Sequence, residues 1–173
     1  IIEKPVISEI EFSYKLIQKQ QNKPKLIGVT GTNGKTTVTK LIAHLAQIPV
    51  AGNIGYPLIN LVGTKYDAIV VELSSYQLET CQQFRPDIAI LLNLTEDHLE
   101  RHKTMTEYFN MKMKIATKQT TSDVFIYPKD GLNKFTFPKL NTNLVAVSLD
   151  EKSSKYLNDS RLIGTHNEIN IAC

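Results

Sequence analysis

Three glycines, four threonines, an asparagine and a lysine lie within the ten residues GVTGTNGKTT, Gly28 to Thr37. This stretch follows the short apolar run KLIGV and precedes TTVTKLIAHLAQ, whose apolar residues recur at helical spacing: Val38, Leu41, Ile42 and Leu45. The stretch is therefore predicted to be a turn from a strand into a helix. Such a turn binds phosphate well, because glycine leaves backbone N–H groups accessible and the start of a helix is electropositive.

Phosphate-binding turns of this kind also use a lysine and a hydroxyl. Lys35 is predicted to reach the β- and γ-phosphates of a nucleotide, and Thr36 to offer its hydroxyl to Mg²⁺. The other residues predicted to surround the nucleotide phosphates are Gly31, Thr32, Asn33, Gly34 and Thr37. Val29 stands where the strict P-loop pattern has glycine, so a simple Gly/Thr-rich turn with a solvated lysine is the alternative.

Length and composition predict one globular domain, since 42% of the 173 residues are hydrophobic and no repeat is visible. The net charge of +3 comes from 20 basic and 17 acidic residues without a dense basic stripe, which argues against nucleic acid as a partner. No apolar run is long enough for a membrane span, and the first residues are too charged for a signal peptide, so a cytoplasmic protein is expected. Cys81, expected in a helix, and Cys173 show no metal-binding spacing.

Apolar runs alternate with helical patterns along the chain. The predicted strands are Lys25–Val29, Pro49–Ala51, Asp67–Glu72, Asp87–Asn93, Asp123–Tyr127 and Asn143–Ser148. This alternation predicts an α/β fold of the three-layer P-loop type, in which a mostly parallel sheet carries helices on both faces. Ligands of such sheets bind beyond the carboxyl ends of the strands.

Polar residues end two of the predicted central strands. Glu72 ends AIVVE, and Asn93 ends IAILLN just before TEDHLERH. A carboxylate that faces a phosphate-binding turn commonly completes a magnesium site, because Mg²⁺ prefers oxygen ligands. Alternatively, Glu72 is a carboxylate that stabilises the start of the following helix.

A lysine lies on the apolar side of a later predicted helix. KTMTEYFNMKMKIATKQ has Thr104 and Glu107 at the spacing of a capping box, and Lys112 falls on the stripe of its apolar residues. A buried lysine loses solvation, which favours the neutral and more reactive amine. In the alternative interpretation, the stem of Lys112 packs while its ammonium group reaches water.

Several motifs together resemble those of the Mur ligases. These are GVTGTNGKTT, AGNIGYP, VVELSSYQLE, LLNLTEDHLERH with Lys112 downstream, and GTHNEIN, in the order found in that family. The resemblance covers most of the chain and implies that residues 1–173 are the central ATP-binding domain. It implies further that residues 1–24 lead in from an N-terminal UDP-binding domain and that an amino-acid-binding domain follows. The isolated chain is then expected to bind nucleotide poorly and to catalyse little.

The resemblance also implies an activity. Family members use ATP to phosphorylate a substrate carboxylate, and the amine of an amino acid then attacks the acyl phosphate to form an amide. ELSSYQLE and DHLERH resemble most closely the members that join D-glutamate to UDP-N-acetylmuramoyl-L-alanine in bacterial peptidoglycan synthesis. A monomer that uses ATP and two Mg²⁺ ions in the cytoplasm is therefore expected.

Residue roles follow from the resemblance at matching positions. It implies that Lys35 contacts phosphates, that Thr36 and Glu72 hold one Mg²⁺ ion, and that His98 helps to hold a second. Lys112 matches a lysine that becomes carbamylated and serves the metal site.

The remaining matches concern substrate and nucleotide. Asn53 corresponds to an asparagine near the reacting groups, Ser74 to a residue near the substrate, and Asn170 to an asparagine near the adenine. His166 and Asn167 are expected to shape the turn before that asparagine.

Two alternatives stay open at this stage. A folylpolyglutamate synthetase shares TGTNGKTT, although ELSSYQLE argues against it, and a nucleotide-binding module without ligase activity would keep Lys35 and Thr36.

The connection between the predicted helix and the next strand is short. The segment from His44 to Asn53 passes from helix to strand without a turn signal, where relatives have a longer connection.

Overall fold

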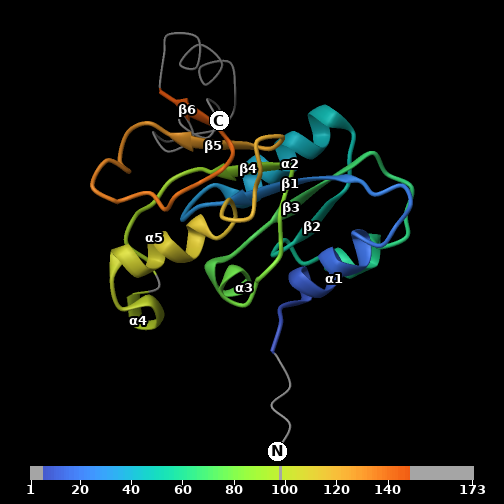
Figure 1. The fold of residues 1–173 in the computed structure, drawn as a ribbon, viewed down its shortest axis with the longest axis horizontal. Coiled ribbons are helices and arrows are strands. Elements are labelled where there is room, and N and C mark those ends of the chain that lie inside the picture. The colour runs from blue at the N-terminus through green and yellow to red at the C-terminus, as the bar shows by residue number, and fades with distance from the viewer. Residues whose placement is uncertain (1–5, 98, 149–173) are drawn as a thin grey trace, which may run out of the picture.

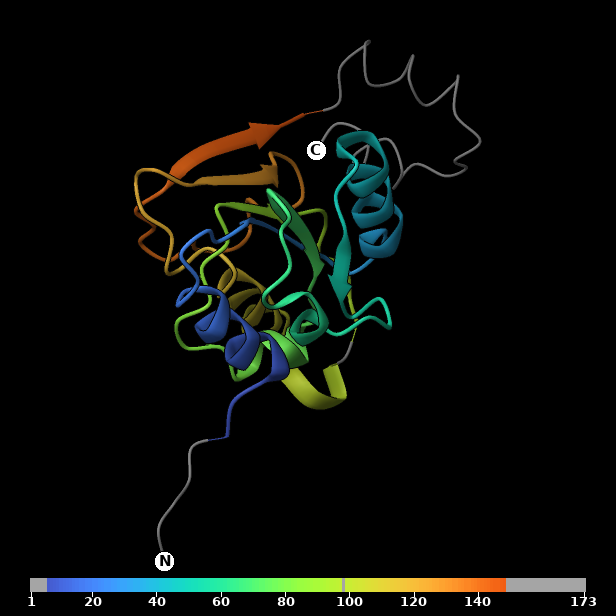
Figure 2. The ribbon, with the colours of Figure 1, turned by 90° about the vertical axis from the view of Figure 1, so that its right-hand side faces the viewer.

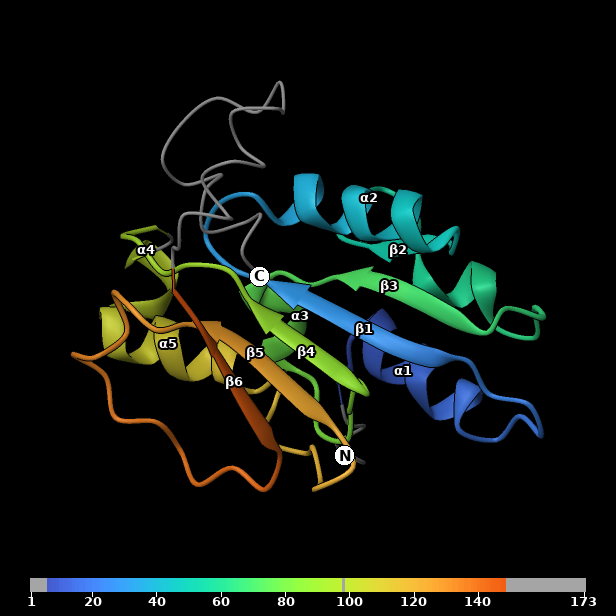
Figure 3. The same cartoon turned by 90° about the horizontal axis from the view of Figure 1, so that it is seen from above.

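The computed structural model describes residues 6–97 and 99–148, which form a six-stranded sheet with helices on both faces (Figure 1). The strands lie in the order β2-β3-β1-β4-β5-β6, and every pair of neighbours is parallel. Figure 3 looks onto the sheet and shows this order from β6 at one edge to β2 at the other. The carboxyl ends of all six strands therefore meet at one edge of the sheet, where a ligand site is expected.

The strands agree closely with the apolar runs of the sequence. They are β1 (Lys25–Thr30), β2 (Val50–Gly52), β3 (Ala68–Glu72), β4 (Ile88–Leu91), β5 (Val124–Pro128) and β6 (Asn143–Val147). The predicted α/β fold and its parallel sheet are confirmed, with strand ends that move by a few residues.

The helices divide unequally between the two faces. They are α1 (Glu9–Ile17), α2 (Lys35–Ala46), α3 (Ser75–Glu79), α4 (Leu99–His102) and α5 (Met105–Met113), with the 3-10 helix η1 (Leu58–Leu61). Figure 2 shows α2 on one side of the sheet and α1, α3 and α5 on the other. No helix in residues 6–97 and 99–148 is long and apolar enough to cross a membrane.

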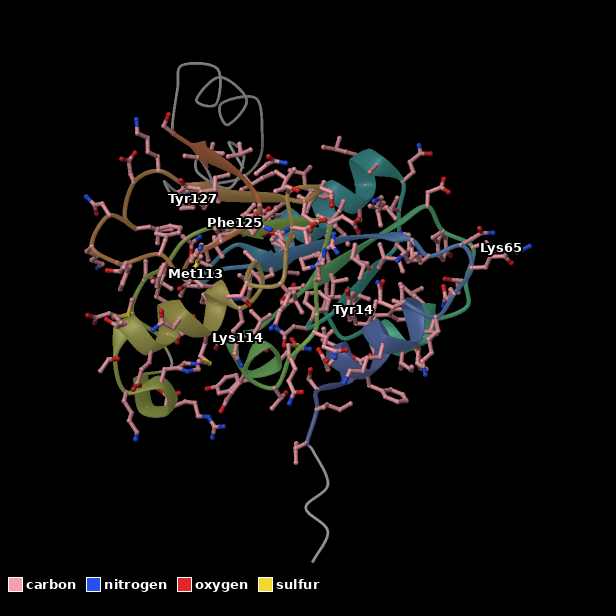
Figure 4. All side chains as sticks on the ribbon, in the orientation of Figure 1. Tyr14, Lys65, Met113, Lys114, Phe125 and Tyr127 are labelled. Carbon is pink, nitrogen blue, oxygen red and sulfur yellow. The ribbon has the colours of Figure 1, made fainter. Side chains whose placement is uncertain are left out.

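The alternation of side chains along the strands builds two cores. In β4, Ala89 and Leu91 belong to the large core under α1, α3 and α5, whereas Ile90 packs with Val29 and Val38 under α2. Figure 4 shows the outer part of the large core, where Met113 of α5 lies near Phe125 and Tyr127 of β5. Burial on both faces explains why the central strands read as continuous apolar runs.

A buried carboxylate, that of Glu11, binds helix α1 to the rest of the domain through hydrogen bonds. The carboxylate of Glu11 accepts hydrogen bonds from the backbone N–H groups of Gln82, Gln83 and Phe84 at 3.0–3.1 Å. Burial acts to raise the pKa of Glu11, but these hydrogen bonds outweigh it and hold the pKa below its ordinary value. Glu11 therefore closes the turn that leads into β4.

Two local predictions can be compared with the structure. The connection from α2 to β2 needs only three residues, 47–49, because Gln47 takes the left-handed conformation at φ 53° and ends the helix.

The prediction of a helix at Cys81 is wrong. Helix α3 ends at Glu79, and the Cys81 thiol is held instead by the Gln77 carbonyl and the Ser8 hydroxyl.

Candidate functional site: a phosphate-binding loop at the carboxyl edge of the sheet

The loop between β1 and α2 has the conformation of a phosphate-binding turn. Gly34 occupies the N-cap of α2 with φ 81°, a left-handed conformation that glycine adopts without strain. Lys35 folds back over the loop, where its Nζ donates to the carbonyl oxygens of Gly31 at 3.0 Å and Thr32 at 2.8 Å. Burial lowers the pKa of Lys35, and nearby Glu72 and Asp97 oppose that effect.

The side chain of Asn93, two residues beyond the end of β4, forms hydrogen bonds that hold the loop in place. Its side-chain oxygen accepts from the backbone N–H groups of Thr32 at 3.1 Å and Asn33 at 2.8 Å, and its amide nitrogen donates to the Asn33 carbonyl at 2.9 Å. The Thr32 hydroxyl accepts from the backbone N–H of Thr95 at 3.1 Å and lies 3.2 Å from the Thr95 carbonyl, to which it donates. The loop is thus shaped before any ligand arrives.

Glu72 brings together two other predicted site residues. Its carboxylate accepts from the Thr36 hydroxyl at 2.8 Å and from the Asn53 side-chain amide at 3.1 Å. Glu72 is only 2% exposed and lies at the carboxyl end of β3, beside β1. Thr36 and Glu72, predicted to share one Mg²⁺ ion, are therefore in direct contact, and Asn53 lies beside the same carboxylate.

Gly52 allows β2 to approach Glu72 this closely. Its φ is 96°, and a Cβ built on it would lie 2.2 Å from the carbonyl oxygen of Glu72. The backbone N–H of Asn53 donates to that same carbonyl at 3.0 Å. The glycine in AGNIGYP is therefore required for both its conformation and its lack of a side chain.

Lys112 reaches the loop from α5 and is 1% exposed, so the alternative in which its ammonium group reaches water is wrong. Its Nζ donates to the Gly31 carbonyl at 2.8 Å and lies 4.4 Å from the centre of the Tyr108 ring. Burial, aided by the positive charge of Lys35, lowers the pKa of Lys112 to about 7. A substantial fraction of this amine is uncharged at neutral pH.

Other predicted residues have different places. Ser74 caps the N-terminus of α3, where it exchanges hydrogen bonds with Gln77 in a capping box, two residues beyond Glu72. Thr37 lies in the first turn of α2. His98, Asn170, His166, Asn167 and Cys173 lie outside the described residues.

The sequence interpretation missed Tyr108 and left the role of Asn93 undefined. Tyr108 is 1% exposed, and its hydroxyl oxygen lies 3.5 Å from the hydroxyl oxygen of Thr32. An aromatic residue on an apolar helix stripe looks like an ordinary core residue, so no local signal marks it. Asn93 did carry a signal, because a polar residue that ends an apolar strand is unusual.

The site combines a lysine, backbone N–H groups and oxygen ligands around one turn. The Thr36 hydroxyl and the Glu72 carboxylate suit Mg²⁺, which keeps several waters when the protein supplies few ligands. No cluster of three His, Cys, Asp or Glu side chains that could hold a metal occurs within residues 6–97 and 99–148. The fold and the site define an α/β phosphate-binding domain of the P-loop type.

Comparison with known proteins gives the family. The sequence model of the Mur ligase middle domain matches residues 29–173, and this chain belongs to that family. Its relatives include UDP-N-acetylmuramoylalanine--D-glutamate ligase of Clostridioides difficile (strain 630), which is 38% identical over 170 residues, covering 92% of this chain and 37% of the relative. The ligase of the same name from Natranaerobius thermophilus is 39% identical, covering 96% of this chain and 43% of its own length.

Solved structures agree with the fold. The crystal structure of MurF ligase from Thermotoga maritima in complex with ADP has a TM-score of 0.63 at 21% identity, covering 82% of this chain and 36% of that one.

The chain spans about two fifths of the length of its curated relatives. The alignment with the Natranaerobius ligase runs over 198 positions, more than the 173 residues of this chain, so that relative has residues without a counterpart here.

Proposed function

We propose that this chain is the ATP-binding centre of a ligase that joins D-glutamate to UDP-N-acetylmuramoyl-L-alanine for peptidoglycan synthesis in the bacterial cytoplasm. The observation that carries the proposal is the meeting of Lys35, Thr36, Glu72 and Lys112 at one phosphate-binding loop. The relatives are named as ligases of UDP-N-acetylmuramoylalanine and D-glutamate, which supplies the substrates of the proposal. Domains beyond this chain would bind the uridine nucleotide and the amino acid, and residues 1–24 would lead in from the first of them.

The proposed reaction has two steps. A carboxylate oxygen of UDP-N-acetylmuramoyl-L-alanine attacks the γ-phosphorus of ATP, which breaks the bond to the β-γ bridging oxygen and forms an acyl phosphate and ADP. The amine of D-glutamate, having lost a proton, then attacks the acyl carbon, forms the amide and expels phosphate. Lys35 and the backbone N–H groups of the loop offset the negative charge that the two substrates bring together.

The chain offers ligands for the two Mg²⁺ ions of the proposal. Thr36 and Glu72 would hold one, and His98 with a carbamylated Lys112 would help to hold the other. Bound Mg²⁺ neutralises charge on the transferred phosphoryl group. Asn53 donates to Glu72, which would keep its amide beside the reacting groups, while Ser74 would lie near the substrate and Asn170 would serve the adenine.

Carbamylation of Lys112 is supported by the state of its amine. A neutral lysine adds CO₂ at Nζ with loss of one proton, and burial keeps this amine partly neutral at pH 7. The product is an anion next to Lys35, in place of a second cation. Incorporation of ¹³C-bicarbonate at Lys112, seen as a carbamate carbon signal that Lys112→Met lacks, would test this step directly.

The assignment is tested by phosphate release from Mg-ATP by the complete protein that the gene encodes. With UDP-N-acetylmuramoyl-L-alanine present, release is expected with D-glutamate and not with L-glutamate or L-lysine. Release with another amino acid would assign a different Mur ligase, and release with a folate substrate and L-glutamate would assign a folylpolyglutamate synthetase. Nucleotide binding without release under any condition would indicate a binding module. Sedimentation of the same sample tests the proposed monomer.

A further inference from the structure

His102 is a buried histidine that the reaction described above does not use. It ends α4 and is only 6% exposed. Its Nε2 lies 2.9 Å from the hydroxyl of Ser75, the 2% exposed first residue of α3. Burial and this hydrogen bond restrict the orientation of the His102 ring.

The imidazole ring of His102 also packs on Tyr108. The two rings are stacked, with centroids 5.1 Å apart and an angle of 28° between their planes. Tyr108 in turn contacts the phosphate-binding site twice, because its ring lies 4.4 Å from the Lys112 Nζ and its hydroxyl bonds to Thr32. A continuous set of contacts therefore runs from α3 through His102 and Tyr108 to the loop.

We propose that His102 is a positioning residue for the proposed ligase reaction: it fixes the Tyr108 ring and thereby the place of the Lys112 amine at the loop. His102 ends α4 and stacks its ring on Tyr108 of α5, so it acts on the orientation of Tyr108 from a neighbouring helix. The inference rests on the proposed function only for its kinetic consequence. Its structural consequence, the position of Lys112, can be measured without any nucleotide.

The first measurement is the nuclear magnetic resonance signal of the Lys112 ε-methylene group in the ¹³C-lysine-labelled chain. The Tyr108 ring shifts this signal away from those of exposed lysines, and Lys112→Arg identifies it by its loss. His102→Ala is expected to move the signal towards the exposed lysines, and His102→Phe, which keeps a ring against Tyr108, to restore most of the shift. Ser75→Ala, which removes only the hydroxyl partner, is expected to move it in the same direction as His102→Ala.

The second measurement is turnover by the complete protein. His102→Ala is expected to lower kcat about tenfold or more while the KM for ATP changes less than about threefold, since a misplaced group slows chemistry more than binding. His102→Phe is expected to recover most of kcat. The matched control is Gln119→Met: Gln119 is 3% exposed and donates to the carbonyls of Pro86 and Val124, at the amino-terminal ends of β4 and β5 rather than at the carboxyl edge that carries the loop.

The inference is overturned if folded His102→Ala leaves the Lys112 signal and kcat unchanged, or if Gln119→Met produces the same changes. Where His102→Ala does not fold, an unmoved signal in Ser75→Ala overturns it. If the wild-type protein shows no ATP turnover, the proposed function fails, while the Lys112 signal still decides the role of His102.

Discussion

Lys35 and Lys112 donate to the same oxygen atom, the carbonyl of Gly31, at 3.0 and 2.8 Å. Two amines that approach one another in a buried site repel when both are charged, which adds to the effect of burial on the pKa of Lys112. An anion that reaches the loop relieves this repulsion. Nucleotide phosphate, or a carbamate on Lys112, is such an anion.

Replacement of Lys112 by methionine is expected to stabilise the folded chain in a pH-dependent way. Because the folded pKa of about 7 lies below the unfolded value of about 10.5, the unfolded chain binds more protons between them, and wild-type stability rises with pH there. The gain from Lys112→Met is therefore largest below pH 7, at roughly 2–5 kcal/mol, and declines as the pH approaches 10.5.

Denaturant unfolding of the wild type and Lys112→Met between pH 6 and pH 10 measures this difference. The matched control is Lys118→Met, since Lys118 is exposed. A gain from Lys112→Met that stays constant with pH would show that the amine is not buried as a titrating group.

Glu72→Gln is expected to weaken binding of Mg-ATP by about 10- to 100-fold while affinity for metal-free ATP changes little, because only the metal-bound form uses the carboxylate. Titration of the complete protein with ATP, in Mg²⁺ and in EDTA, measures both affinities. Asp67→Asn serves as the control, since Asp67 is exposed and precedes β3 at the opposite edge of the sheet. Equal losses with and without Mg²⁺ would argue against a metal ligand.

Gly52→Ala is expected to disrupt the site. The new Cβ would meet the Glu72 carbonyl at 2.2 Å, and both the clash and the φ of 96° oppose it. The expected loss of unfolding free energy exceeds about 3 kcal/mol. Gly63→Ala is the matched control, because φ is 83° there and nothing lies within 4 Å, so it should cost only about 1–2 kcal/mol. Equal losses from the two variants would mean that the close approach of β2 to β3 does not matter.

Glu11→Gln is expected to lower the unfolding free energy by about 2 kcal/mol, because a neutral amide cannot accept all the N–H groups of the turn and places an N–H donor against one of them. The folded pKa of Glu11 lies below its ordinary value of 4.5, so this stabilisation is present above pH 4.5 and is lost as pH falls through the folded pKa. The wild type and the variant should therefore converge in thermal stability towards acid pH. A difference that persists unchanged at low pH would assign the effect to packing.

The sequence predicted most of the fold because its elements depend on neighbouring residues. AIVVE and IAILLN read as buried strands, and GVTGTNGKTT as a strand-to-helix turn, from patterns a few residues long. The place of Lys112 on the apolar stripe of α5 left two interpretations open, and the structure decides for the buried amine. Cys81 was misplaced, because α3 ends after five residues and the chain turns to meet Glu11, which no local pattern marks.

Contacts across long separations were the part that the sequence could not predict. Asn93 shapes the loop from 60 residues away, and His102 meets Ser75 from 27 residues away. Such pairs depend on the packing of whole elements rather than on local spacing. The family resemblance supplied roles for single residues, but it assigned none to Tyr108 or to His102, which ends the motif DHLERH.

The measurement that tests the site most directly is a crystal structure of the complete protein with Mg²⁺ and a non-hydrolysable ATP analogue. Lys35 is expected to leave the Gly31 and Thr32 carbonyls for the phosphates, and Thr36 and Glu72 are expected to exchange their mutual hydrogen bond for the metal. Phosphates bound elsewhere, with Lys35 still on those carbonyls, would show that this loop is not the nucleotide site.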